Sequence, residues 1–257
     1  MDLKKRNIDN LTSLWQLINR KADTYVIGNT FDYGAIAYSD WPNKLWFINR
    51  PTQGDIDTVK KIIASSPIKI TIPYWEIEGN EYESLLLGNG FEKVLEQVGM
   101  ALDLSKRAFT PSGLELQRVE NKDSAQLWES LFEKAFNYKI HHELILKCLG
   151  EIEFLIAHDG NYPVGTALTY NTGKEIIGIH SMGIIPEMRR KGYAEKMMHS
   201  MLYEAVKKGY SHVTLQASAM GKGLYEKLGF EEQFSMSNYA FSEISSSRTN
   251  TMFNQKA

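Results

Sequence analysis

Short apolar runs separated by turn residues organise the second half of the chain. Glu153 to Ala157 and Val164 to Tyr170 predict two strands joined by a turn at residues 158–161, and Glu175 to Ile184, rich in isoleucine, predicts a third strand. Strands linked by such short turns form an antiparallel meander. Pro186 then ends the third strand.

A helical pattern follows the meander. From Gly192 the apolar residues recur every three or four positions, and Gly209 stands where a helix C-terminal cap is expected. His212 to Gln216 predicts a strand that should lie parallel to the third strand, because a helix connects the two by a right-handed crossover. A short helix near Gly223 to Leu228 and a hairpin or long strand over Phe230 to Phe241 complete a mixed sheet.

The first half repeats this order in abbreviated form. Its expected elements are a strand near Lys44 to Asn49, a helix near Ile56 to Ala64, a strand near Ile68 to Pro73, a helix near Tyr82 to Leu87 and a strand near Gln97 to Leu104. The stretch Leu85 to Glu92 aligns with Leu224 to Glu231, and both contain a Gly-Phe pair after a helix. We interpret the pattern as an internal duplication, with Ser105 to Gly113 as the linker.

Composition narrows the class of protein. A length of 257 residues suits two domains, and 29 basic against 31 acidic residues give no broad positive field for nucleic acid. No apolar run reaches the ~20 residues of a membrane span, and residues 1–10 are too charged for a signal peptide, so a cytoplasmic protein without a membrane partner is expected.

Several chemically suggestive residues favour structural roles. Cys148 is the single cysteine, which excludes an internal disulfide, and its amphipathic surroundings predict a buried, inert thiol. His141 and His142 are adjacent on an expected helix and should face different ways, so no metal site is predicted. Three tryptophans of the first half are more typical of core or interface than of a cofactor site: Trp41, Trp46 and Trp75.

A group of cations stands between the third strand and the helix that follows it. Three consecutive cations, residues 189–191, precede the small residues Gly192 and Ala194. The first amides of a helix lack internal acceptors and carry partial positive charge, so residues 189–195, the phosphate loop, are predicted to bind a pyrophosphate. The alternative is a solvated basic helix start, although cations are unfavourable there unless an anion lies nearby.

At these residues the chain resembles the GNAT superfamily of N-acetyltransferases. The family signature Gln/Arg-x-x-Gly-x-Gly/Ala is matched by Arg189 to Ala194, with Pro186 before it and Leu224 to Phe230 after it. The resemblance covers about residues 114 to 241, with a fainter echo over residues 1 to 104. It implies an α+β fold of two tandem GNAT-like domains, each a mixed, mostly antiparallel sheet flanked by helices. The boundaries expected are a degenerate, non-catalytic domain at 1–108, a catalytic domain at 109–243 and a flexible tail at 244–257.

The resemblance also implies a binding site for acetyl-CoA and no metal. The pantetheine arm would bind the main chain of Met182, Gly183 and Ile184, and the pyrophosphate would bind the phosphate loop. Ser218 occupies a position where the family often has an asparagine that contacts the cofactor. The full set of expected cofactor-binding residues is Met182, Gly183, Ile184, Arg189, Arg190, Lys191, Gly192, Tyr193, Ala194, Glu195 and Ser218.

Two catalytic residues follow from the same comparison. Tyr225 matches the general acid that protonates the departing thiolate, a modest task for a thiol with a pKa of about 8.5; the alternative is a packing aromatic. The acceptor amine must lose a proton, and His180 lies where some family members place a basic histidine. The alternatives are a histidine satisfied in the core and Glu175 as the base.

The expected function is acetyl transfer from acetyl-CoA to an amine by direct attack in a ternary complex. The acceptor, a small molecule or a peptide, is left open, as is a homodimer. The first half lacks the phosphate loop, since Pro51 removes an amide there and Leu86 replaces Tyr225. Two rivals stay open: a non-catalytic acyl-CoA-binding or sensory module, and a structural protein whose duplicated sheets serve association.

Overall fold

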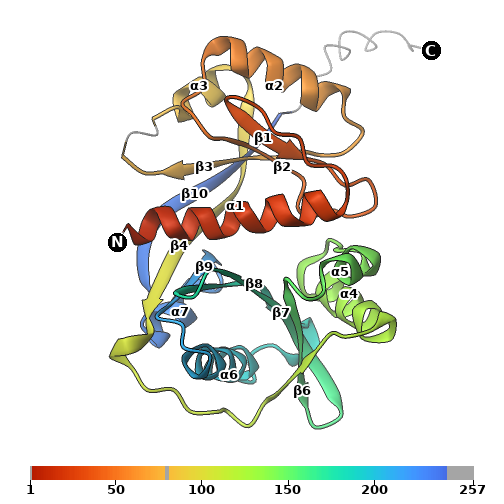
Figure 1. The fold of residues 1–257 in the computed structure, drawn as a ribbon, viewed down its shortest axis with the longest axis vertical. Coiled ribbons are helices and arrows are strands. Elements are labelled where there is room, and N and C mark those ends of the chain that lie inside the picture. Colours follow the sequence, from red (N-terminus) through yellow and green to blue (C-terminus); the bar gives the residue numbers. More distant parts are fainter. Residues whose placement is uncertain (1, 79–80, 242–257) are drawn as a thin grey trace, which may run out of the picture.

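One continuous eight-stranded sheet runs through the computed structural model, which describes residues 2–78 and 81–241. The strand order is β3-β10-β4-β9-β8-β7-β6-β5, and β8 and β9 are parallel neighbours in an otherwise antiparallel sheet (Figure 1). Its strands are β3 (Ile72–Glu76), β4 (Phe91–Asp103), β5 (Glu115–Arg118), β6 (Glu153–Asp159), β7 (Tyr162–Thr172), β8 (Ile176–Ile184), β9 (His212–Ser218) and β10 (Glu231–Phe241). A separate ribbon pairs β1 (Phe31–Gly34) with β2 (Lys44–Phe47).

Helices cover both faces of this sheet. They are α1 (Leu3–Lys21), α2 (Gln53–Ser65), α3 (Glu83–Gly88), α4 (Lys122–Phe136), α5 (His142–Cys148), α6 (Tyr193–Lys207) and α7 (Lys222–Leu228), with single 3-10 turns at Leu104–Lys106 and Pro186–Met188. In the second half, the apolar side of α6 packs on one face of the sheet, while α4 and α5 pack on the other. None of the helices among the described residues has both the length and the apolar character needed to cross a membrane.

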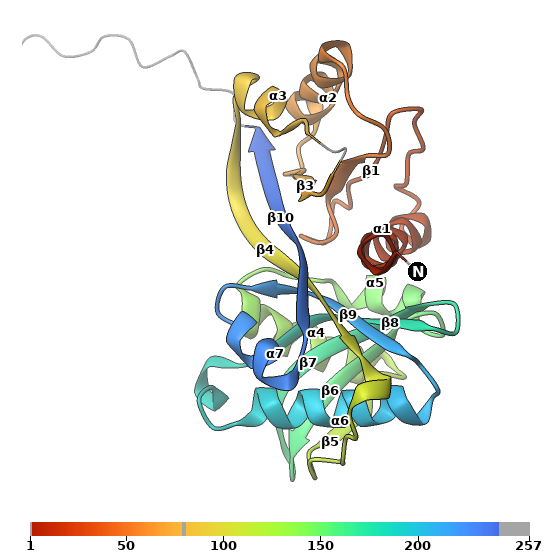
Figure 2. The same cartoon turned by 90° about the vertical axis from the view of Figure 1, so that its left-hand side faces the viewer.

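Two long strands join the halves of the chain. β4 leaves the first half and pairs with β9, while β10 leaves the second half and pairs with both β3 and β4 (Figure 2). The expected pair of tandem domains, each with its own sheet, is therefore not confirmed, because the two halves share one sheet. The expected tail at 244–257 lies outside the described residues.

The aligned segments of the two halves share their local structure. α3 is followed by Gly90 at φ +84° and α7 by Gly229 at φ +91°, and each glycine leads through a phenylalanine into a long strand. The left-handed backbone at these two positions explains the glycines. The long strands that follow, β4 and β10, are antiparallel neighbours.

The sequence interpretation placed most strands and short helices but missed α1 and α4. α1 starts at Asp2, whose side chain accepts a hydrogen bond from the Lys5 amide at 3.1 Å. Its buried apolar residues follow helical spacing: Leu11, Leu14, Trp15 and Ile18. This spacing in the sequence is sufficient to predict an amphipathic helix here. Of the two alternatives expected near the end of the chain, a hairpin or a long strand, the structure has the long strand, Glu231–Phe241.

α1 lies between the two halves and is held there by buried asparagines (Figure 1). Asn7 Nδ2 donates to the Met100 carbonyl of β4 at 3.1 Å, and Asn10 Nδ2 donates to the Tyr170 carbonyl of β7 at 3.0 Å. Buried amides cost free energy unless they are hydrogen-bonded. These bonds therefore fix α1 against strands of both halves.

Other predictions for structural residues are confirmed. Cys148 is fully buried, and burial raises the pKa of its thiol to about 12. Trp46 and Trp75 are buried in an aromatic cluster with Trp15.

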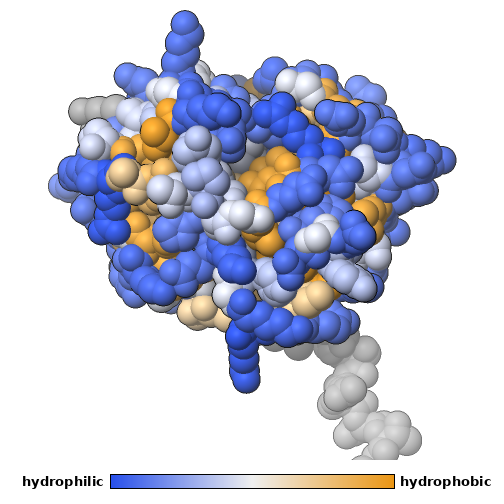
Figure 3. Space-filling view, turned by 90° about the horizontal axis from the view of Figure 1, so that it is seen from below, coloured by the Kyte–Doolittle hydropathy of each residue, from blue (hydrophilic) through white to orange (hydrophobic). Residues whose placement is uncertain are grey.

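Seen from the end where α6 lies, the surface is mainly hydrophilic, with apolar side chains visible in recesses (Figure 3).

Candidate active site

β8 and β9 separate after a short parallel ladder. The ladder joins Ile176 to Gly178 with His212 to Thr214, after which β8 stays with β7 and β9 stays with β4. A bulge bends β8 at the point of separation: Ser181 has φ +51°, and the register with β7 shifts there. The two strands are therefore not paired beyond Gly178 and Thr214.

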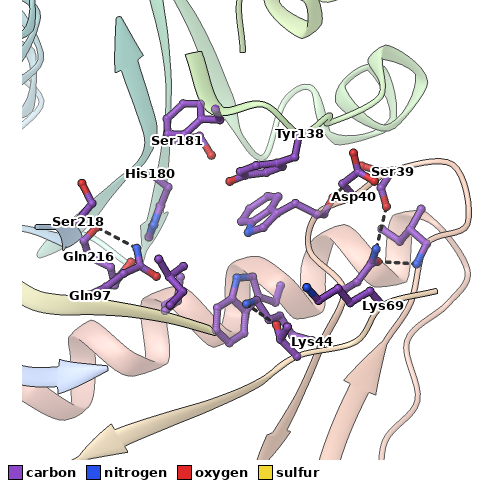
Figure 4. Close-up of a pocket in the computed structure, with 18 of the residues that line it drawn as sticks. Ser39, Asp40, Lys44, Lys69, Gln97, Tyr138, His180, Ser181, Gln216 and Ser218 are labelled. Atoms are coloured by element: carbon purple, nitrogen blue, oxygen red, sulfur yellow. Dashed lines mark hydrogen bonds between the residues drawn. The ribbon is translucent and has the colours of Figure 1, made fainter. Parts of the chain in front are cut away.

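A cavity of about 800 Å³ opens beside this point of separation, between the two halves of the chain. Its walls come from α1, β4, β8, β9 and α7 and from two segments of the first half, residues 36–44 and 67–71. Figure 4 shows His180, Gln216 and Ser218 on one side of the cavity, with Lys44 and Lys69 on another. Tyr225 and Met182 also line it, so the structure brings four of the predicted site residues to one cavity.

The amides of the phosphate loop are free to bind a ligand. α6 begins after Gly192, which has φ +81° and no capping side chain. Its first amide bond to a main-chain carbonyl is from Lys196 to Gly192 at 3.1 Å. Within the described part of the chain, the amides of residues 190–195 donate to no carbonyl or side chain. A Cβ added at Gly192 would meet no atom within 4 Å, so the approach to these amides is open.

His180 projects from β8 into the cavity wall and is 7% exposed. Burial lowers the pKa of its imidazole to about 4, and a contact with the Gln216 amide offsets part of that shift. The side chain is thus neutral at physiological pH and can accept a proton.

Asn10 of α1 sets the tautomer of His180. Because the Asn10 amide donates to the Tyr170 carbonyl and to Thr172 Oγ1, its oxygen is left to accept from His180 Nε2 at 2.9 Å. The hydrogen-bond network therefore assigns the proton to Nε2 and the lone pair to Nδ1. Sequence reasoning missed Asn10, which lies 170 residues from its partner.

Tyr225 is 8% exposed and lies on α7 with its ring against Phe230 at 5.7 Å between centroids. Burial raises the pKa of its hydroxyl to about 12, so it stays protonated. Ser218 ends β9, and its Oγ accepts from the Gly221 amide at 3.3 Å. Ser218 therefore shapes the turn that carries α7 and Tyr225.

The arrangement described above has counterparts among known proteins. Residues 150–232, which span β6 to the start of β10, match the family described as the acetyltransferase (GNAT) domain. This stretch is therefore similar to the acetyltransferase (GNAT) domain over about a third of the chain. The comparison with curated proteins gave no match.

Solved structures extend the likeness of the GNAT fold to nearly the whole chain. A GCN5-related N-acetyltransferase from Kribbella flavida is 14% identical with a TM-score of 0.69, and the match covers 92% of this chain and 95% of that one. A putative GNAT acetyltransferase from Novosphingobium aromaticivorans is 13% identical with a TM-score of 0.59 over 90% and 96% of the two chains. A tandem GNAT protein from the clavulanic acid biosynthesis pathway is 10% identical with a TM-score of 0.57 over 82% and 77%. These three likenesses show a shared fold.

Arg189, the first residue of the GNAT signature, turns its side chain toward its own chain. Its Nε donates to the Ile184 carbonyl at 3.0 Å and its Nη2 to the Ala135 carbonyl at 2.8 Å. These bonds tie the phosphate loop to β8 and α4. The side chains of Arg190 and Lys191 are exposed at the start of the loop.

Replacing Arg189 with methionine is expected to lower stability by about 1 to 2 kcal/mol, because two carbonyls lose a charged donor. The matched control is Arg190→Met, since the Arg190 side chain bonds to no described residue; its effect should stay within about 0.5 kcal/mol. Thermal unfolding of both variants measures the difference. Equal melting temperatures would contradict this role of Arg189.

Two further side chains of the phosphate loop, those of Tyr193 and Glu195, are engaged elsewhere. The Tyr193 hydroxyl donates to Asp159, and Glu195 forms an ion pair with Lys227 at 2.8 Å. Both residues can therefore offer a phosphate only their main-chain amides. The side chain of Ala194 is a single methyl group, which takes up little space at the helix start.

Glu175, the reserve base, is not among the residues that line the cavity. It lies just before β8, where its carboxylate pairs with Arg6, and this pairing lowers the pKa of Glu175. It is exposed and connects α1 to the start of β8. His180 is therefore the better placed of the two candidate bases.

The expectation that His141 and His142 face different ways is wrong. His141 is the N-cap of α5 rather than a helical residue, and the two rings stack at 4.3 Å. With Glu129 they place possible ligand atoms within 4.8 Å of one another. The Lys139 ammonium forms an ion pair with Glu129 Oε1 at 3.2 Å, and His142 Nδ1 lies 2.6 Å from Glu129 Oε2, so Glu129 already has two partners.

Proposed function

We propose that the protein transfers an acetyl group from acetyl-CoA to an amine, with the cofactor held by the phosphate loop and the gap between β8 and β9. One observation carries this proposal: β8 and β9 separate beside a cavity lined by His180 and Tyr225, and the helix that follows β8 starts with unpaired amides. A non-catalytic acyl-CoA-binding module would need the unpaired amides and the separated strands. It would not need a neutral imidazole and a protonated phenol in the same cavity.

The residues present fit coenzyme A. The amides of residues 190–195 can receive the pyrophosphate, as anions bind well at a helix start. The main chain of Met182, Gly183 and Ile184 borders the gap on the β8 side and is suited to the amides of the pantetheine arm. Acetyl-CoA supplies an activated acetyl group at a thioester.

The side chains around the cavity then have defined tasks. The acceptor nitrogen forms a bond to the thioester carbonyl carbon, and His180 Nδ1 takes the proton that this nitrogen loses. A main-chain amide near the β8 bulge stabilises the oxyanion. The carbon–sulfur bond breaks, and the Tyr225 hydroxyl protonates the sulfur.

Replacing His180 with glutamine is expected to lower kcat/KM for the acceptor by about 100-fold, since general base catalysis is lost. Acetyl-CoA binding should stay within about twofold, because the imidazole serves the acceptor. His212→Gln is the matched control: this histidine starts β9 outside the cavity and bonds to Ser211. Thiol release from acetyl-CoA with a panel of amines measures the rate. A His180→Gln variant that reacts at the parental rate would show that His180 is not the general base.

The same assay separates the proposed function from its rivals. An acyl-CoA-binding module would be stabilised by acetyl-CoA but would release no thiol with any amine. A purely structural protein would gain no thermal stability, whereas a ligand at a hundred times its dissociation constant adds about 2.7 kcal/mol.

We also propose that residues 1–108 are a degenerate copy of residues 109–243 and do not catalyse. The shared α3–β4 and α7–β10 geometry supports the duplication, as does the likeness in fold to a tandem GNAT protein. Leu86 takes the place of Tyr225 in the first copy. Its role is then to supply the second wall of the acceptor cavity.

A further inference from the structure

A lysine of the first half reaches the cavity opposite His180. Lys44 opens β2, and its Nζ donates to Thr71 Oγ1 at 2.8 Å and to Asn238 Oδ1 at 2.6 Å. Its ammonium lies 5.8 Å from the centre of the Trp15 ring. Lys44 lines the cavity, as Figure 4 shows, and is half-buried.

This lysine has no anionic partner among the described residues. Among the described residues no carboxylate lies within ion-pair distance of its Nζ, and both of its hydrogen-bond acceptors are neutral. An ammonium has three N–H donors, so one is left for a ligand. Burial lowers the pKa of Lys44 to about 7, and an anionic ligand beside its Nζ would favour the charged form.

The other charged side chains of the cavity do not compensate Lys44. Lys69 is a second cation on the same side, exposed at the cavity wall. Asp40 is the one carboxylate in the described lining, and its Oδ2 already accepts from the Lys139 amide at 2.8 Å. The cavity therefore favours an anionic group near Lys44.

We propose that the acceptor amine also carries a carboxylate, which binds to Lys44 while the amine lies at His180. This inference rests on the proposed function and adds the chemical class of the acceptor: an amino acid or another amino carboxylate. The cavity between the two ends is lined by Leu11, Trp15 and Met236, which suit the carbon skeleton of such a molecule. One remaining N–H on one enclosed cation matches a carboxylate oxygen better than a phosphate group, which needs several donors.

Matched acceptor pairs test the proposal on the unaltered protein. Each pair compares an amino acid with its carboxamide, for example phenylalanine with phenylalaninamide and lysine with lysinamide. The acid should be acetylated with a kcat/KM about 10- to 100-fold above that of the amide, mostly through KM, because a hydrogen-bonded charge pair contributes to binding. Thiol release measures the rates. Amides that react as well as the acids overturn the inference while leaving acetyl transfer in place.

Lys44→Met, which keeps most of the length of the side chain and removes its charge, should abolish the preference for the acid. The control is Lys69→Met, which removes the exposed cation and should change the preference less than about threefold. Thermal unfolding is expected to show Lys44→Met at least as stable as the parent, since a poorly compensated charge is removed.

A binding measurement tests the class of acceptor separately from acetyl transfer. If no amine is acetylated, the proposed function fails, and calorimetry of the same acids and amides with the protein saturated in coenzyme A still tests the acceptor class. Acids that bind to the parent but not to Lys44→Met support the inference. Equal binding of acids and amides to both proteins overturns it.

Discussion

Replacing Gly192 with aspartate is expected to weaken acetyl-CoA binding by about 30-fold or more while the protein stays folded. The new carboxylate would stand at the free amides of residues 190–195, repel the pyrophosphate and accept hydrogen bonds that the phosphates need. Aspartate is among the residues that tolerate a left-handed backbone, here φ +81°, and no atom lies within 4 Å of its Cβ. Calorimetric titration with acetyl-CoA measures the loss.

Gly192→Asn is the matched control for this variant. Asparagine has the same shape and the same tolerance of the left-handed backbone but no charge, so the loss of affinity should be only a few-fold. An acidic residue at a helix start is favourable in the free protein, so thermal unfolding should show Gly192→Asp at least as stable as Gly192→Asn. Equal acetyl-CoA affinities for the aspartate variant and the parent would remove the phosphate loop from the proposed site.

Tyr225→Phe is expected to lower kcat by about 10- to 100-fold and to leave the KM for acetyl-CoA nearly unchanged. Phenylalanine keeps the ring against Phe230 and removes only the hydroxyl that protonates the thiolate. The loss should stop short of abolition, because a thiolate with a pKa of about 8.5 leaves without full protonation. Steady-state kinetics with one amine and varied acetyl-CoA separate the two constants.

The pH profile provides a second readout for Tyr225. Because burial raises the pKa of its hydroxyl to about 12, the parent should show no alkaline decline from this group below about pH 11. The phenylalanine variant should lose rate evenly over the same range. A variant with parental kcat would leave Tyr225 as a packing residue, the alternative that its burial also permits.

Local sequence patterns predicted residues 153–241 well because the elements there are determined by residues close in the chain, whereas α4 in the same half was missed. The parallel crossover from β8 to β9 and the helix start at Gly192 follow from periodicity and turn residues, and the structure confirms both. α1 was missed although Leu11, Leu14, Trp15 and Ile18 have helical spacing. The first turn of α1 is charged, and the buried apolar residues with helical spacing begin only at Leu11.

The polar surroundings of the site could not be predicted from local patterns. Asn10 orients His180 across 170 positions, and Lys44 bonds to Asn238 across 194. Such pairs form only because α1 and β2 are folded against the second half. Arg189 illustrates a different limit: the signature gives its position, while its bonds to two carbonyls depend on where α4 ends.

The exchange of β4 and β10 between the halves restricts how the protein can admit an acceptor. Each strand is bonded along much of its length to strands of the opposite half, so opening the cavity like a hinge would break ladder hydrogen bonds. The width of the entrance is then set by the backbone and changes only as side chains rotate. Acceptors would be selected by size as they enter, rather than by closure of one half over the other.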